Sequence, residues 1–180
     1  VEQLGSLDIL VNNAGATRRG DFLELDDAAW SEGFGLKFFG AMRLMRAAWP
    51  HLRRASGCIV NIAGVGGRTA SADFTIGGSV NAALINLTKA LADQGVTDGV
   101  RVNVINPGYI ETDRLHTRLQ ALARQSGDSM EVVKERLRRQ LRIGRFGQAT
   151  DVARLAAFLA SPAAAYLQGS VIDVDGGLTR

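Results

Sequence analysis

The sequence has little cysteine, little histidine and few aromatic residues. A single cysteine, Cys58, in 180 residues excludes a disulfide framework and is typical of a reducing compartment. The two histidines, His51 and His116, are far apart in the chain. A site built from histidine and cysteine ligands needs such residues close together, so the sequence predicts no metal site.

Long apolar runs are also missing. No run approaches the ~20 residues that span a bilayer, and no signal peptide is visible. The sequence therefore predicts a soluble, cytoplasmic protein with no membrane partner. Its 180 residues fit one domain, residues 1–180, and a hydrophobic content of 46% is enough to bury a core.

Excess charge of one sign is small. The net charge is +3 and the sequence pI is about 9.5, with much of the excess in "KERLRRQLRIGR", residues 134–145. Two interpretations of this segment stay open: a solvated helix face, or a contact for a phosphate or an acidic partner. Aromatic residues do not alternate with these cations, so we predict no nucleic-acid partner.

Short apolar runs that end in glycine recur along the chain. Such runs indicate strands buried on both faces. Helical stretches separate them, and this alternation predicts an α/β fold with a parallel sheet covered by helices on both sides. The four runs are "LDILVNNAG" (7–15), "GCIVNIAGVGG" (57–67), "VRVNVINPG" (100–108) and "GSVIDVDGG" (169–177).

Three intervening segments have the periodicity of buried helices. Asp26 or Asp27 is placed to cap the first helix, and the third runs from about residue 150 to 160. The apolar residues expected to line the helices are Trp30, Phe34, Phe38, Met42 and Met45 in the first, Ala82, Ile85, Leu87 and Leu91 in the second, and Val152, Leu155 and Leu159 in the third.

The segment 114–145 interrupts this alternation of strands and helices. It contains two amphipathic helical pieces separated by "QSGDS". Insertions after the carboxyl end of a strand commonly cover the ligand in open sheets of this kind. We therefore expect a helical lid or insertion here.

Polar motifs follow three successive strands of the predicted sheet. They are "NNAG" (12–15), "NIAG" (61–64) and "NPGYIETD" (106–113), and "DVDGG" (173–177) follows the fourth strand. Small residues allow a ligand to approach the backbone, and asparagine offers both a donor and an acceptor. A single Asn–Gly pair indicates only a turn, but three at successive strand ends indicate a ligand site.

Together these motifs resemble the short-chain dehydrogenase/reductase family over essentially the whole chain. The resemblance implies a Rossmann-like, doubly wound sheet that binds NAD or NADP, and hydride exchange between a small-molecule alcohol and a carbonyl. It also implies a homo-oligomer, a dimer or tetramer. The cofactor-binding residues that it implies are Asn13, Ala14, Gly15, Ile62, Pro107, Gly108, Ile110 and Thr112.

The catalytic positions of that family are all changed in this sequence. The resemblance places Gly64 at the serine, Gly77 at the tyrosine, Asn81 at the lysine and Lys37 at the supporting asparagine. Glycine supplies neither a proton nor a hydrogen bond from a side chain. General acid–base catalysis contributes about 10²–10⁴-fold, and one oxyanion donor a comparable factor, so the usual reaction should be nearly silenced.

Three residues remain as candidates for the missing chemistry: Lys37, Asn81 and Tyr109. Lysine and asparagine have exchanged positions relative to the family, which keeps one cation and one amide in the pocket if both side chains point inward. Independent drift after loss of activity explains the same exchange. An inward Lys37 would stabilise an oxyanion or titrate with a lowered pKa.

The family's Gly-rich fingerprint belongs to a region upstream of these motifs and is not in this sequence. We therefore expect the chain to be the C-terminal part of a longer NAD(P)-binding domain. Two functions stay open: an oxidoreductase with a non-standard active site, or a catalytically inactive nucleotide-binding or scaffolding subunit. The substrate, and the choice between NAD and NADP, are not determined by the sequence.

Overall fold

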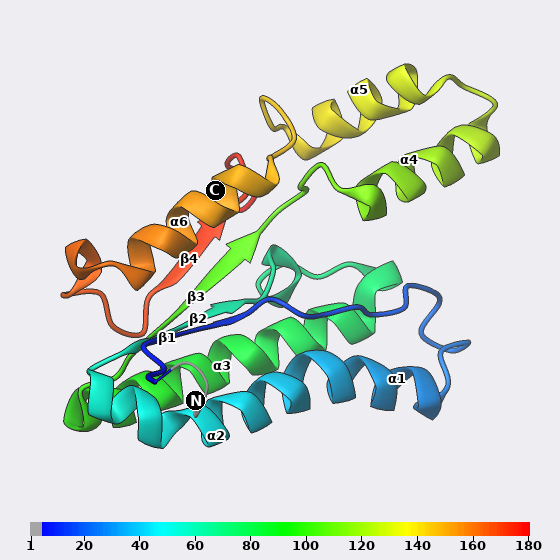
Figure 1. Ribbon diagram of the computed structural model, residues 1–180. Coiled ribbons are helices and arrows are strands. Elements are labelled where there is room, and N and C mark those ends of the chain that lie inside the picture. The colour runs from blue at the N-terminus through cyan, green and yellow to red at the C-terminus, as the bar shows by residue number, and fades with distance from the viewer. Residues whose placement is uncertain (1–4) are drawn as a thin grey trace.

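Strands and helices alternate along the chain in the computed structural model (Figure 1). The structure describes residues 5–180, so residues 1–4 of the predicted domain lie outside it. The elements are β1 (Ile9–Asn12), α1 (Asp27–Phe34), η1 (Gly35–Phe39), α2 (Gly40–Ala55), β2 (Cys58–Ile62), η2 (Val65–Gly67), η3 (Ala72–Phe74), α3 (Thr75–Asp98), β3 (Arg101–Pro107), α4 (Asp113–Ser126), α5 (Met130–Leu141), α6 (Ala149–Ala160), η4 (Pro162–Ala164) and β4 (Val171–Val174).

The four strands form one parallel sheet in the order β1-β2-β3-β4, which confirms the predicted α/β class. Each predicted apolar run contains one strand. In the register of the sheet, Asn12 of β1 lies opposite Asn61 of β2, and Pro107 of β3 lies opposite Val174 of β4. The parallel arrangement brings all the polar motifs to one edge, beyond the carboxyl ends of the strands.

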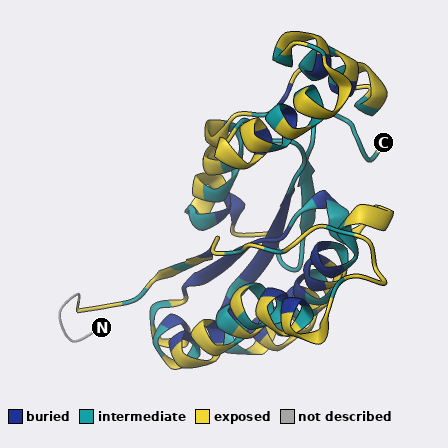
Figure 2. Cartoon of the chain, turned by 90° about the vertical axis from the view of Figure 1, so that its right-hand side faces the viewer, coloured by how far each residue is buried: buried dark blue, intermediate teal, exposed yellow. Residues whose placement is uncertain are grey.

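Helices cover both faces of the sheet, with α1, α2 and α3 on one side and α6 on the other (Figure 1). All five residues of β2 are buried, and the central strands form the dark band between the helix layers in Figure 2. Ile59 packs in a cluster with residues of α2 and α3, whereas Val60 and Ile62 pack in a cluster with Leu159 of α6. The core therefore has one part on each side of the sheet.

The outer strand β1 departs from the prediction of burial on both faces. Ile9 is 47% exposed and Val11 is 45% exposed, whereas Asn12 is buried. Within the described residues 5–180, β1 pairs with β2 alone, and helix α6 packs on β2 and β3. An apolar run indicates burial, but the position of the strand in the sheet decides how much of it is covered.

The prediction for the first helix is confirmed, whereas that for the second needs one correction. Residues 27–55 form α1, η1 and α2 as one nearly continuous rod, with Asp26 accepting a hydrogen bond from the backbone N–H of Ala29 as the N-cap. In α3 the prediction for Ala82 was wrong, because this residue is exposed. The buried face of α3 is instead offset around the helix and is formed by Ile76, Gly77, Val80, Asn81, Leu84, Thr88, Ala92 and Gly95.

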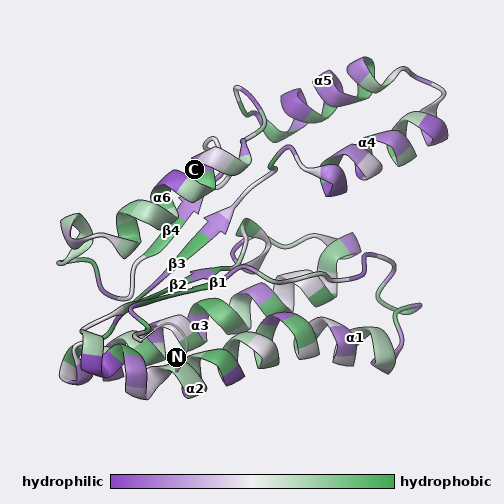
Figure 3. Ribbon diagram, viewed as in Figure 1, coloured by the Kyte–Doolittle hydropathy of each residue, from purple (hydrophilic) through white to green (hydrophobic). Residues whose placement is uncertain are grey.

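Segment 114–145 contains α4 and α5, which extend beyond the carboxyl end of β3 (Figure 1). Hydrophilic and hydrophobic residues alternate along both helices (Figure 3), and the apolar faces pack on each other in a small separate core. The residues of this core are Leu115, Leu119, Val133, Leu137, Ile143 and Phe146.

The basic residues of segment 134–145 are largely neutralised by neighbouring acids. Ion pairs join Lys134 to Glu111 at 2.6 Å, Arg138 and Arg139 to Glu135 at 2.7 Å, and Arg145 to Asp151 at 2.7 Å. This pairing favours the interpretation of a solvated helix face.

Across residues 5–180, no helix is long and apolar enough to cross a membrane. In the same range, no group of three or more His, Cys, Asp and Glu side chains is arranged to hold a metal ion.

Candidate active site

The candidate site lies at the carboxyl edge of the sheet, where the segments after β1, β2 and β3 meet. Asn13 and Ala14 are exposed after β1, and Gly15 is half-buried. After β3, Pro107, Gly108 and Ile110 are half-buried and Thr112 is exposed. Ile62 is buried near the end of β2. The structure thus places most of the predicted cofactor-binding residues around one edge.

Lys37 reaches this edge from η1, a π-helical segment between α1 and α2. Its Nζ donates a hydrogen bond of 2.5 Å to the carbonyl oxygen of Ala63, directly after β2. Its stem lies against Gly15, where a Cβ atom would be only 2.8 Å from Cδ of Lys37. π-Helical turns are frequent at functional sites because they change the direction of the following side chains.

Burial changes the acidity of this amine. The pKa of Lys37 is lowered from 10.5 to about 8, mainly because burial disfavours the charged form and secondly because of the positive charge of Arg114. An amine with this pKa exchanges protons near neutral pH, which an ordinary lysine does not. Lys37 also keeps donors beyond the one that Ala63 accepts, since an ammonium group has three.

Asn81 lies in the buried face of α3, with only 3% of its surface exposed. Its Nδ2 lies 3.0 Å from the place of a Cβ atom on Gly64, so the amide occupies the space beside that residue. Its Oδ1 is buried without a hydrogen-bond partner among residues 5–180. Buried polar atoms are normally paired, so this acceptor is suited to a donor from a bound molecule.

Gly77 faces an aromatic ring instead of an open pocket. A Cβ atom on Gly77 would lie only 2.1 Å from Cζ of the Phe74 ring, and one on Gly66 would lie 2.8 Å from the same ring. Phe74 therefore fills the space next to the position that the resemblance assigns to a tyrosine. Gly64 has φ of 152°, a backbone conformation that side-chain-bearing residues rarely adopt.

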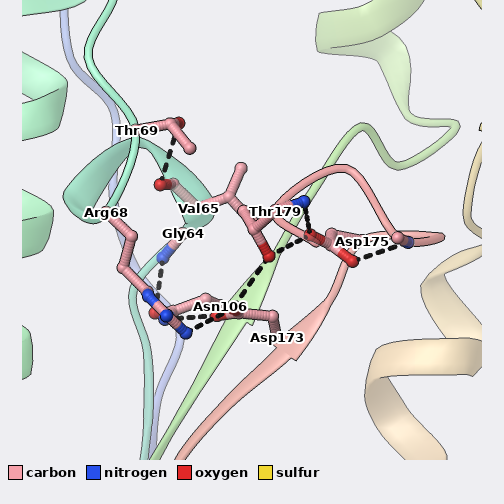
Figure 4. A network of polar contacts seen from close by, with 9 residues as sticks. Gly64, Val65, Arg68, Thr69, Asn106, Asp173, Asp175 and Thr179 are labelled. Carbon is pink, nitrogen blue, oxygen red and sulfur yellow. Dashed lines mark hydrogen bonds and ion pairs between the residues drawn. The ribbon is translucent and has the colours of Figure 1, made fainter. Parts of the chain in front are cut away.

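A polar network holds the turn that contains Gly64 (Figure 4). The backbone N–H of Gly64 donates to Oδ1 of Asn106 at 3.4 Å, and Nδ2 of Asn106 donates to Asp173 at 2.9 Å. Asp173 also accepts hydrogen bonds from Arg68 at 2.5 Å and Thr179 at 2.9 Å. The ends of β2, β3 and β4 are thereby fixed to one another directly behind the candidate site.

Tyr109 is engaged by Arg118 of α4. Nη1 of Arg118 lies 3.1 Å from the hydroxyl of Tyr109, and its guanidinium carbon lies 5.3 Å from the centre of the ring. The structure brings Lys37 and Asn81 to the same turn, residues 63–66, whereas no contact joins Tyr109 to that turn among the hydrogen bonds of residues 5–180. Of the three candidates, Lys37 and Asn81 therefore lie at the same turn.

Sequence reasoning missed two residues of the site. Arg114 in the first turn of α4 donates a hydrogen bond of 2.8 Å to the carbonyl oxygen of Gly15, although 99 positions separate them. No local signal identifies such a contact. Phe74 directly precedes the glycine-rich helix, about one helical turn before Gly77. This spacing is the signal in the sequence that could have placed the ring beside Gly77.

The residues at this edge fit a nicotinamide dinucleotide. The segments Asn13–Gly15 and Pro107–Thr112, which are exposed to half-buried, offer backbone and hydroxyl groups. Oδ1 of Asn81 has no donor within residues 5–180. Gly108 is packed so closely that a Cβ atom would lie 2.8 Å from the backbone of Asp175, so the segment after β3 needs a residue without a side chain here.

Comparison with known proteins gives a consistent result. Residues 1–179 match the model of the enoyl-(acyl carrier protein) reductase family. The acetoacetyl-CoA reductase of Rhizobium meliloti strain 1021 is 36% identical over 175 residues, which cover 97% of this chain and 68% of the relative.

Two solved structures are also similar. An NADPH-bound short chain oxidoreductase from Pseudomonas aeruginosa PAO1, described as containing an atypical catalytic center, is 37% identical with a TM-score of 0.87, covering 99% of this chain and 68% of that one. The L-sorbose reductase of Gluconobacter frateurii in complex with NADPH and L-sorbose is 31% identical with a TM-score of 0.93, covering 99% and 69%.

Proposed function

This chain belongs to the short-chain dehydrogenase/reductase family, and on that basis we propose that it is an NADPH-dependent carbonyl reductase with a non-standard active site. The NADPH in two similar structures supports the choice of cofactor. The observation that carries the proposal is the pair formed by Lys37 and Asn81 at the turn after β2.

When bound, the cofactor supplies the hydride that reduces a carbonyl carbon. Lys37 holds the proton that the carbonyl oxygen must gain, since its ammonium is directed to the edge of the site by Ala63 and its pKa is about 8. The neutral amine that remains is reprotonated from water. Lys37 thus acts as the general acid in place of the tyrosine that the family has at the position of Gly77.

Asn81 provides the hydrogen bond that polarises the carbonyl oxygen. Its Nδ2 group occupies the space beside Gly64, where the family's serine hydroxyl would stand. A fixed amide donor aimed at a developing oxyanion contributes about 10²–10³-fold in comparable sites. The buried Oδ1 remains available to accept a hydrogen bond from the ligand.

We also propose that the catalytic unit is a longer NAD(P)-binding domain to which residues 1–180 belong, with segment 114–145 as its lid. The hydrogen bond from Arg114 to Gly15 supports the lid, because it joins the start of α4 to the segment after β1 across the site. The contacts of Arg118 support the same arrangement further along α4.

A catalytically inactive subunit remains as the second candidate. The packing of Phe74 against Gly77 favours it, because an apolar ring stands beside the position of the family's proton donor. Such a protein would bind the cofactor without turnover.

The test is NADPH oxidation with a panel of aldehydes and ketones, using the protein and the variants Lys37→Met, Lys37→Arg and Lys89→Met. We expect kcat/KM to fall above pH ~8, where Lys37 loses its proton. Lys37→Met should lose about 10²–10⁴-fold. Lys89, exposed on α3, is the matched control and should change little.

Lys37→Arg separates two roles of this residue. Arginine keeps the positive charge but does not release a proton near neutral pH. Loss of activity in this variant supports proton donation, and retention supports a purely electrostatic role. Binding of NADPH without turnover of any carbonyl would contradict the reductase and support the inactive subunit.

A further inference from the structure

Two arginines from distant parts of the chain converge on one carboxylate at the mouth of the site. Nη1 of Arg19, in the segment after β1, lies 2.9 Å from Oδ2 of Asp73. Nη2 of Arg118, in α4, lies 3.9 Å from the same oxygen. Ser71 donates a hydrogen bond to the other oxygen of Asp73. We call Arg19, Asp73 and Arg118 the arginine cluster.

The arginine cluster adjoins the proposed reaction centre. Asp73 precedes Phe74, and the guanidinium carbon of Arg19 lies 3.9 Å from the centre of the Phe74 ring. That ring in turn packs on Gly77 and Gly66. One aromatic side chain therefore lies between the guanidinium of Arg19 and the glycine turn beside Asn81.

The arginine cluster carries a net charge of +1. The hydrogen bond from Ser71 is the main reason that the pKa of Asp73 is lowered, with Arg19 contributing, so the carboxylate stays ionised at neutral pH. Two guanidinium groups then face one carboxylate. This imbalance suits one further monoanion.

Both guanidinium groups remain accessible and keep unused donors. The side chain of Arg19 is 39% exposed and that of Arg118 is 30% exposed. A guanidinium has five N–H donors, of which Asp73 and the Tyr109 hydroxyl take only a part. Packing on Phe74 and Tyr109 fixes the planes of the two groups, so they are preorganised for a planar anion.

We propose that the arginine cluster binds a carboxylate at the end of the substrate remote from the reacting carbonyl, so that the substrate is an oxo acid. The proposal rests on the proposed reductase function and deepens it by naming the substrate class. Arg19 and Arg118 act as specificity-determining residues. They orient the substrate and take no part in proton transfer.

The test compares acetoacetate, levulinate and 5-oxohexanoate with their methyl esters. In these acids one to three methylene groups separate the carbonyl from the carboxylate, and acid and ester differ in the charge of the end group. For at least one pair we expect KM to be roughly 10–100-fold lower for the acid. This factor corresponds to the binding free energy of one or two charge-assisted hydrogen bonds. Arg19→Gln and Arg118→Gln should abolish this preference by raising KM for the acid, with kcat and the ester little changed.

Arg18→Gln is the matched control, because it removes the same charge from an exposed neighbour that forms no ion pair within residues 5–180. It should keep the preference for the acid. Equal KM values for acid and ester in every reduced pair would overturn the proposal. An equal loss of the preference for the acid in Arg18→Gln would also overturn it, because it would indicate a long-range electrostatic effect of positive charge instead of a binding site.

A binding measurement separates this proposal from the reductase function. Butanoate should shift the arginine side-chain Nε–Hε signals of the protein in ¹⁵N NMR spectra, and butanamide should not. The shift should disappear in Arg118→Gln and in Arg19→Gln, and persist in Arg18→Gln. If no carbonyl is reduced but butanoate binds in this way, only the reductase function fails. If butanoate causes no shift, the carboxylate site is refuted.

Discussion

At the scale of single residues, large side chains pack into the space beside glycines at the candidate site. Gly15 leaves room for the stem of Lys37, and Gly77 leaves room for the ring of Phe74. The glycines therefore do not leave empty space at the candidate site.

The buried ammonium of Lys37 should destabilise the fold at neutral pH. Because its folded pKa is about 8 and its ordinary value is 10.5, the charged form is penalised in full below pH 8. Between those values the unfolded state binds more protons, so the stability of the protein should rise with pH. Lys37→Met should raise the free energy of unfolding at pH 7 by about 1–3 kcal/mol, at ~1.4 kcal/mol per pKa unit less the lost hydrogen bond.

Urea unfolding at pH 7 and at pH 10 measures this effect. The free energy of unfolding of Lys37→Met should exceed that of the unaltered protein by less at pH 10 than at pH 7. Lys89→Met, on an exposed side chain, should stay within ~0.5 kcal/mol at both. A destabilised Lys37→Met at pH 7 would contradict the buried position of the amine.

Gly77→Ala should destabilise the protein by about 1–3 kcal/mol, because its Cβ atom overlaps the ring of Phe74. Replacing that ring as well, in Gly77→Ala with Phe74→Ala, should cost less than the sum of the two single changes, as a double-mutant cycle of chemical unfolding detects. Gly144→Ala has no atom within 4 Å of the added Cβ and serves as the control. Additive single effects would mean that the two residues do not touch.

At the scale of elements, η1 and α4 bring charged side chains to the candidate site. η1 directs Lys37 toward Ala63 at the junction of α1 and α2, and α4 supplies the arginines that contact Gly15 and Tyr109. The helices α4 and α5 have their own small core, separate from the clusters that flank the sheet. They should therefore loosen without unfolding the sheet.

Leu137→Ala tests this independence. The side chain lies in the α4–α5 core, and its truncation should cost about 2–5 kcal/mol within that unit. Hydrogen exchange should accelerate in α4 and α5 while protection in β2 and β3 is retained. Leu84→Ala, in the core between α2, α3 and the sheet, is the comparison and should accelerate exchange throughout. Equal acceleration in both variants would show one cooperative unit.

At the scale of the whole molecule, a buried polar chain links the strands to the helix layer. Nδ2 of Asn12 donates to Oδ1 of Asn61 at 2.8 Å, and Nδ2 of Asn61 contacts Oγ1 of Thr88 at 2.9 Å and Sδ of Met45 at 3.5 Å. These contacts join β1, β2, α2 and α3. A buried network of this kind is strong only while each member keeps its partners.

Asn61→Ala should therefore lower global stability by about 1–3 kcal/mol beyond the loss of packing, since the amide of Asn12 loses its acceptor. Urea unfolding followed by circular dichroism and by tryptophan fluorescence should shift together. Asn86→Ala, exposed on α3, should cause little change. A neutral Asn61→Ala would mean that water replaces the lost side chain at no cost.

The sequence predicted the architecture well because local patterns encode it. Each apolar run between glycines contains a strand, and Asp26 caps the first helix. The prediction that Ala82 is buried was wrong, because periodicity reports an apolar face but not which neighbours cover it. The roles of Lys37, Asn81 and Tyr109 stay predictions, although their positions are now known.

By itself, the sequence determined the alternation of strands and helices, the parallel sheet and the glycines at positions 64 and 77. Only the tertiary structure decided that Phe74 fills the space at Gly77, that Lys37 points to Ala63, and that Arg19 and Arg118 meet at Asp73. Such contacts join residues far apart in the chain. Their geometry follows from how the layers pack, and no local pattern of residues records it.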